Sequence, residues 1–111
     1  MRLIKQSELP WSNIAHELVG DDHGVGISII FVEAEPGRGP SLHTHPYDEI
    51  LIVQEGRAAA TVAGEEVELG AGDIVVVHAN EPHAFTNAGD GLLTQVDIHL
   101  SPRFVTDWLD Q

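Results

Sequence analysis

The chain has 111 residues, with 18 Asp and Glu against 5 Lys and Arg, a formal net charge of −13, and no cysteine. Such an acidic surface repels nucleic acid and anionic membranes. The lack of cysteine excludes disulfides, thiolate nucleophiles, iron–sulfur clusters and zinc fingers. The hydrophobic fraction of 42% is that of a folded protein, and the length predicts one domain over residues 1–111.

The chain begins without a long apolar run, so we expect neither a signal peptide nor a membrane span, and a cytoplasmic protein. Eight short runs then predict an all-β fold, because each is rich in β-branched residues or alternates in polarity. Glycine- or proline-containing turn signals separate most of them, a spacing typical of an antiparallel sandwich or barrel. The expected strands cover residues 26–33, 42–45, 49–54, 57–62, 65–69, 74–78, 83–87 and 92–100.

The tail is the only helical pattern in the sequence. Ser101 can cap a helix, Pro102 suits its first position, and Phe104 and Trp108 fall on one face at the i, i+4 spacing. We expect a short C-terminal helix on the outside of the barrel, with a frayed tail as the alternative.

A histidine–carboxylate cluster follows the second expected strand. His43 and His45 are two residues apart, so on a strand both imidazoles lie on one face, about 7 Å apart. Glu49 begins an apolar run in which an unpaired carboxylate would be costly. Two imidazoles and a carboxylate form a ligand set found in open catalytic metal sites. The spacing does not select a fourth ligand, and two such histidines also occur as plain polar residues on exposed strands.

Two longer segments resemble a known family. Residues 37–56, GRGPSLHTHPYDEILIVQEG, match every fixed position of the first cupin motif, G-x5-H-x-H-x3-E-x6-G. Residues 72–87 resemble the second motif, G-x5-P-x-G-x2-H-x3-N, at Gly72, His83 and Asn87. They depart from it at His78, where the family usually has proline, and at Asn80, where it usually has glycine. Asparagine tolerates a left-handed backbone, so Asn80 can keep the turn.

The chain thus resembles a small single-domain member of the cupin superfamily. The resemblance implies a double-stranded β-helix, or jelly-roll barrel. It also implies a metal ion held by His43, His45, Glu49 and His83. His78 is then either a turn residue at the barrel rim or a group near the metal.

The strand period of two predicts what surrounds such a site. If His83 points inward, so do Phe85 and Asn87. The last strand alternates, with Gln95, Asp97 and His99 on one face, and this face either lines the pocket or meets solvent.

The outward-facing residues of the barrel strands suggest contact with another segment or a second subunit. If Glu49 points inward, Ile50 and Ile52 point outward and need a cover, which the C-terminal helix, the N-terminal segment or a second subunit could supply. Related small cupins pair through such sheets, so we expect a homodimer.

Three imidazoles and one carboxylate leave coordination positions open for a ligand. The set suits divalent Fe, Mn, Ni, Co or Zn, and the sequence does not choose among them. The resulting hypothesis is a metal-dependent enzyme of the oxygenase, isomerase or lyase type that acts on a small oxygenated molecule. The alternative is a non-catalytic protein that binds or senses a small molecule or a metal. We expect neither nucleic acid nor a membrane as partner.

Overall fold

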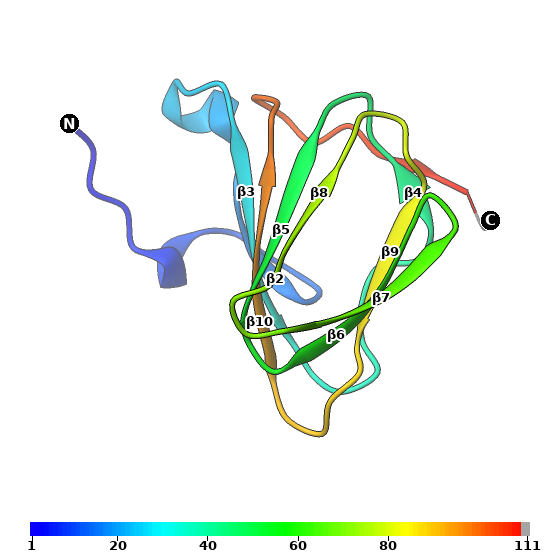
Figure 1. The fold of residues 1–111 in the computed structure, drawn as a ribbon. Coiled ribbons are helices and arrows are strands. Elements are labelled where there is room, and N and C mark those ends of the chain that lie inside the picture. Colours follow the sequence, from blue (N-terminus) through cyan, green and yellow to red (C-terminus); the bar gives the residue numbers. More distant parts are fainter. Residues whose placement is uncertain (110–111) are drawn as a thin grey trace.

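The computed structural model describes residues 1–109, and these form short strands with two single-turn 3-10 helices near the N-terminus (Figure 1). Most strands rise directly from the apolar runs of the sequence. The helical turns are η1 (Gln6–Glu8) and η2 (Gly20–His23). The strands are β1 (Trp11–Ser12), β2 (Ala15–Leu18), β3 (Ser28–Ala34), β4 (His43–Thr44), β5 (Glu49–Glu55), β6 (Arg57–Val62), β7 (Glu65–Gly70), β8 (Ile74–Val77), β9 (His83–Asn87), β10 (Leu93–His99) and β11 (Asp107–Trp108).

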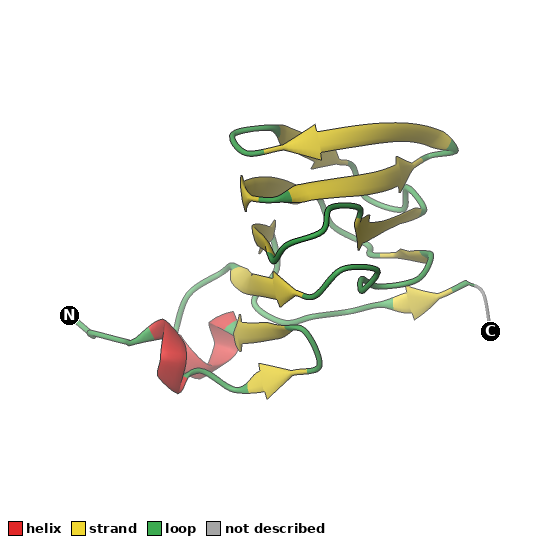
Figure 2. Cartoon of the chain, turned by 90° about the horizontal axis from the view of Figure 1, so that it is seen from below, coloured by secondary structure: helices red, strands yellow, loops and turns green. Residues whose placement is uncertain are grey.

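The strands make two antiparallel sheets that face each other across the interior (Figure 1). One sheet has the order β1-β2-β3-β10-β5-β8, and the other has the order β11-β4-β9-β6-β7. The helical turns lie at one edge, beside the N-terminus, and leave the sheets uncovered elsewhere (Figure 2). The jelly-roll fold predicted from the sequence is therefore confirmed, with β6 and β9 at the predicted bounds.

Strand register decides which residues meet inside the barrel. β10 is buried at every second position, and its partner across the sheet is β5. Three cross-strand pairs follow along the inner face: His99 with Glu49, Asp97 with Leu51, and Gln95 with Val53. Gln95, Asp97 and His99 are each at most 2% exposed. Of the two faces of this strand, the polar one lines the interior.

The apolar core fills the end of the barrel away from Glu49 and His99. It consists of aliphatic side chains and one phenylalanine from both sheets, which bury apolar surface. The glycine at position 56 permits the tight β5–β6 turn, since its φ is +84° and a Cβ would lie 2.6 Å from the carbonyl oxygen of Leu92. The core residues are Ala15, Val32, Ala34, Val53, Ala58, Ala60, Leu69, Phe85 and Leu93.

The prediction of a C-terminal helix was wrong. Residues 101–109 contain no helix and run along the edge of the second sheet, where β11 pairs with β4. The Leu109 N–H also donates to the carbonyl of Leu42. A helix of two turns is marginal in water, whereas an unpaired sheet edge offers ready backbone partners, so the strand prevails. The segment 101–109 is called the C-terminal strap below.

The turn before β9 behaves as its sequence indicates. Asn80 has φ +68° and takes the left-handed position that glycine usually occupies in the second motif. The His78 side chain is 70% exposed and lies 3.8 Å from the carboxylate of Asp48, so it is a rim residue. Within residues 1–109, no helix is long and apolar enough to cross a membrane.

Candidate metal centre

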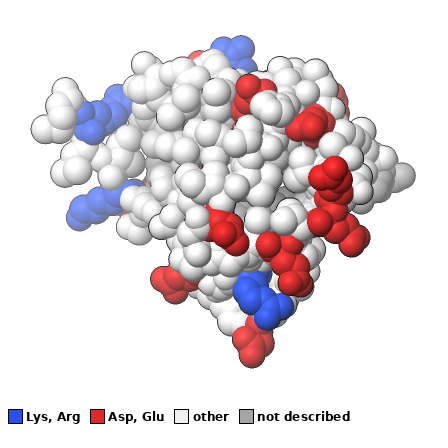
Figure 3. Space-filling view, viewed as in Figure 1, with Lys and Arg blue, Asp and Glu red and all other residues white. Residues whose placement is uncertain are grey.

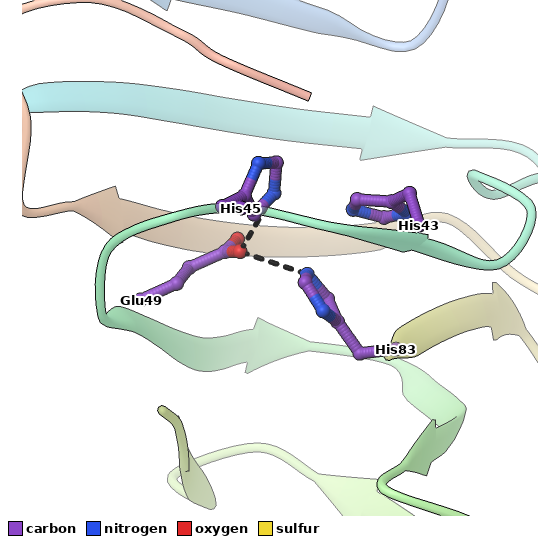
Figure 4. Close-up of side chains that lie close together, drawn as sticks. All are labelled: His43, His45, Glu49 and His83. Atoms are coloured by element: carbon purple, nitrogen blue, oxygen red, sulfur yellow. Dashed lines mark hydrogen bonds and ion pairs between the residues drawn. The ribbon is translucent and has the colours of Figure 1, made fainter. Parts of the chain in front are cut away.

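Four buried side chains converge between the two sheets (Figure 4). His43 comes from β4, His45 follows it, Glu49 begins β5, and His83 begins β9 directly opposite His43. Each offers one ligand atom, and these atoms lie within 4.8 Å of one another. The side chains are only 2–6% exposed. The structure thus brings together all four residues that the cupin resemblance implied.

Backbone carbonyls fix the protonation of the three histidines. The Nδ1 atoms of His43, His45 and His83 lie 2.6, 2.8 and 2.9 Å from the carbonyl oxygens of Ser41, Val105 and Glu81. A carbonyl oxygen can only accept, so each Nδ1 carries a hydrogen. In the neutral imidazole this leaves the lone pair on Nε2, which is the arrangement of metal-ligating histidines.

The Glu49 carboxylate lies close to imidazole nitrogens that carry lone pairs. Glu49 Oε1 lies 3.2 Å from His45 Nε2 and 3.0 Å from His83 Nε2. The buried His45 Nε2 has no aligned hydrogen-bond partner. A cation between these atoms, or protonation of an imidazole, would satisfy them. Three nitrogen donors and one oxygen donor in a buried cluster fit a divalent transition ion.

The titration behaviour follows from burial and from these contacts. Burial alone would raise the pKa of Glu49, but the contacts with His45, His83 and His99 outweigh it and hold that pKa well below its usual range. Burial lowers the pKa of His43 to about 4. Burial also opposes protonation of His83, but the contact with Glu49 raises the pKa of His83. Glu49 and His43 are therefore in their ligating forms near neutral pH.

A fourth histidine approaches Glu49 from the other side. His99 Nε2 lies 3.0 Å from Glu49 Oε2, although not in the alignment of a full hydrogen bond. The Tyr47 hydroxyl lies 2.7 Å from His99 Nδ1 and also accepts from the Val105 N–H at 3.3 Å. Because a carboxylate oxygen can only accept, the His99 proton sits on Nε2 facing Glu49, and the Tyr47 hydroxyl donates to Nδ1. Burial raises the pKa of Tyr47 to about 12, which keeps this donor protonated.

A cavity of about 340 Å³ opens beside the four residues. Asp97 and His99 line it, which settles the orientation of the last strand that the sequence left open. Phe85 lines it as well. The described lining does not include Gln95 or Asn87. Gln95 donates to Asp97 Oδ1 at 2.8 Å. Asn87 is buried and ties the β9–β10 loop, since its amide donates to the carbonyls of Ala34 and Gly91.

Several lining residues were missed at the sequence level. Glu17 and Ile14 come from the β2 region, whose short run has little β propensity. Phe104, Thr106 and Trp108 come from the C-terminal strap. The Trp108 ring lies 4.9 Å from that of His43, measured between centroids. The i, i+4 spacing marked Phe104 and Trp108 as partners but suggested the wrong secondary structure.

Comparison with known proteins places this geometry in a family. Residues 30–99 match the profile of the cupin domain. The chain belongs to the cupin family. Among curated relatives of this cupin, the polyketide synthase CurC of Streptomyces cyaneus is 38% identical over 68 residues, which is 60% of this chain and 44% of CurC. The HTH-type transcriptional regulator PuuR of Escherichia coli K12 is 28% identical over 79 residues, 70% of this chain and 43% of PuuR. The cupin spans less than half the length of these two relatives.

Solved structures give the same fold. A protein from Klebsiella pneumoniae described as having a double-stranded β-helix domain superimposes with a TM-score of 0.78 at 21% identity, over 100% of this chain and 99% of the other. Oxalate decarboxylase of Bacillus subtilis, in a structure whose description names Mn(II) centres, gives a TM-score of 0.78 at 24% identity. That match covers 93% of this cupin and 30% of the enzyme.

Proposed function

We propose that this cupin binds a divalent transition metal through His43, His45, Glu49 and His83. The observation that carries the proposal is the set of three Nδ1–H donors fixed on backbone carbonyls, which leaves Nε2 as the ligand atom of each imidazole, with the Nε2 atoms of His45 and His83 at 3.2 and 3.0 Å from one buried carboxylate oxygen. Oxygen-rich or thiolate sites have other ligand sets, whereas Fe, Mn, Ni, Co and Zn accept this one. The Mn(II) centres named for the oxalate decarboxylase structure support the class of ion.

We further propose that the site is catalytic, with oxygenase, isomerase or lyase chemistry on a small oxygenated molecule. A bound ion would polarise a coordinated oxygen of the substrate or lower the pKa of a bound water. The chain itself supplies the rest: His99 and Tyr47 orient Glu49, Asp97 offers a buried polar contact, and the cavity walls exclude water. The resemblance in sequence to CurC, named as a polyketide synthase, supports an oxygenated organic substrate.

The test begins with metal content. Protein purified without chelators should hold about one transition ion per chain by elemental analysis, and His45→Ala should lose it and melt at a lower temperature. Unchanged metal content in His45→Ala would refute the ligand assignment. Ser41→Ala is the matched control, because the Ser41 backbone carbonyl that holds His43 remains in place.

The second candidate function is a non-catalytic sensor of a small molecule or metal. The match to the regulator PuuR over 70% of this chain favours it. Loaded protein should be screened with diols, keto acids and thiols for oxygen uptake and for product formation. Turnover supports the enzyme, and saturable binding without turnover supports the sensor.

We also propose a cytoplasmic homodimer that pairs through the outer face of the six-stranded sheet. Two cross-strand rows on this face hold ten positions and no carboxylate, in a chain with net charge −13. In the view of Figure 3, acidic side chains gather at the right and below, and none of them belongs to the ten positions of the two rows. Two copies can meet there without charge repulsion, in a self-complementary contact. The rows are Leu18, Ile29, Ile98, Ile50, Val76 and His16, Phe31, Val96, Ile52, Ile74.

Sedimentation at micromolar concentration tests the pairing. The wild type should sediment as a dimer, and Ile52→Lys, which places a charge in the middle of the rows, should sediment as a monomer. Glu66→Lys on β7 of the other sheet is the control, and it should leave the dimer intact. A monomeric wild type would contradict the proposal.

A further inference from the structure

The cavity beside the metal centre has carboxylates but no lysine or arginine among its described lining residues. The carboxylates are those of Glu17, Glu49 and Asp97. All five basic residues of the chain are exposed, and three of them have polar partners away from the metal centre. Arg2 contacts His23, Arg103 contacts Asp21, and Arg57 contacts the carbonyl of Ala88. Arg38 is exposed and bonds the side chain of Asn13, which lines the cavity.

The charge inside the loaded site can be counted from these residues. A divalent ion with the Glu49 carboxylate and three neutral imidazoles carries a net charge of about +1. Asp97, which accepts a bond from Gln95, brings no positive charge to the count, and burial raises its pKa well above the usual value. A singly charged ligand therefore brings the ion and its four protein ligands to neutrality, and Glu17 at the cavity wall adds a carboxylate rather than a compensating cation. A doubly charged ligand leaves one uncompensated negative charge in a place without a cationic partner, which is unfavourable.

The walls impose a second condition. Away from the ligand atoms, apolar side chains from both sheets and from the C-terminal strap form much of the lining. A ligand of two or three polar atoms would leave this surface facing water, whereas a ligand with an apolar group would cover it. The walls include Ile14, Ala15, Ile30, Val32, Phe85 and Phe104.

We propose that the cavity selects a singly charged oxygen chelator that carries an apolar group, and rejects small dicarboxylates such as oxalate. Hydroxamates and the enolates of β-dicarbonyl compounds are molecules of this class. The inference rests on the proposed metal site. Oxalate, the small dicarboxylate in the name of the oxalate decarboxylases that share this fold, is the kind of ligand that the cavity of this cupin would disfavour.

Cobalt(II) binding separates the two proposals. The protein is loaded with Co2+, whose visible absorption bands report the ligand set, and titrated with benzohydroxamate, acetohydroxamate and oxalate. Each affinity is divided by the affinity of the same molecule for aqueous Co2+ in the same buffer. We expect this ratio to be about tenfold or more higher for benzohydroxamate than for oxalate. Acetohydroxamate, which lacks the apolar ring, should fall between them.

The outcomes differ for the two proposals. Absence of protein-bound cobalt bands would overturn the metal site and the ligand preference together. Cobalt bands with an oxalate ratio equal to or above that of benzohydroxamate would overturn the ligand preference alone. Equal ratios for acetohydroxamate and benzohydroxamate would overturn the role of the apolar walls.

A charge reversal at the cavity provides the matched variants. Glu17 lines the cavity from β2 and is half-buried, so a lysine there can reach solvent when the cavity is empty. Glu17→Lys should raise the oxalate ratio by about tenfold and change the benzohydroxamate ratio less. Glu17→Gln, which only removes the negative charge, should give a smaller rise. An oxalate ratio that is the same in the wild type and both variants would refute the charge argument.

Discussion

Replacing His99 with phenylalanine tests whether the side chains behind Glu49 contribute to metal binding. The substitution keeps a ring of similar size in a fully buried position, where His99 is 2% exposed and its ring packs against Phe104 at 4.9 Å between centroids. It removes the Nε2–H that faces Glu49 Oε2 and the acceptor for the Tyr47 hydroxyl. Glu49 then loses the partner on the oxygen that does not face His45 and His83.

The size of the effect follows from the geometry. A hydrogen bond to a charged group contributes roughly 1.5–3 kcal/mol. The His99 contact is short but not well aligned, so we take the lower end, about 1.5 kcal/mol, which is about tenfold in metal affinity. Tyr47→Phe removes one neutral bond and acts only through His99, so its effect should be smaller, at most about fivefold.

Competition with a chromophoric chelator for Zn2+ measures these affinities at pH 7.5. His78→Phe is the matched control, because its imidazole is exposed at the rim and has no contact with the four ligands. Thermal melting of the chelator-treated proteins shows whether each variant is folded. If His99→Phe and His78→Phe bind Zn2+ as tightly as the wild type, His99 does not orient Glu49 and the reasoning is refuted.

Three further predictions concern stability. Because the pKa of His43 falls from 6.5 to about 4 on folding, the metal-free protein should lose up to about 3 kcal/mol of unfolding free energy as the pH falls from 6.5 to about 4. Urea titrations should show this slope, and His43→Gln should lack it; parallel pH profiles would disprove the assignment. Asn87→Ala leaves the carbonyl of Ala34 without its donor and should destabilise the protein by roughly 2–4 kcal/mol with unchanged metal content; a drop in metal content would show a direct role. Leu51→Ala, at a position 1% exposed, should cost roughly 2–5 kcal/mol, and a loss below 1 kcal/mol would mean that the site collapses around the smaller side chain.

The sequence predicted the strands that are strongly patterned and missed those that are not. The run that becomes β5 alternates around a buried face, and its bounds were predicted within one residue. β2 has the sequence AHEL, whose residues favour no strand on their own, and it forms because it pairs with β3. β11 is likewise set by its partner, since the edge of β4 provides the backbone groups that it pairs with.

The candidate site was predictable where ligands share a short motif and less so where they depend on register. His43, His45 and Glu49 lie within seven residues; the strand period puts the two histidines on a common face, and the first cupin motif adds Glu49. The inward face of β10 could not be chosen, because an alternating strand reads equally well in either orientation until its partners are known. The role of Tyr47 depends on His99, which lies 52 residues away, and no local pattern carries such a contact.

The C-terminal strap, at the end of the described chain, contributes directly to the metal centre and its cavity. Its Val105 carbonyl sets the tautomer of His45, and its Phe104 and Trp108 rings close the cavity wall. Yet it pairs with β4 at only two positions, whereas β10 pairs with β3 at seven. The carbonyl that accepts the His45 Nδ1–H, and with it the basicity of that metal ligand, is therefore supplied by a segment that is held to the sheet by two cross-strand pairs.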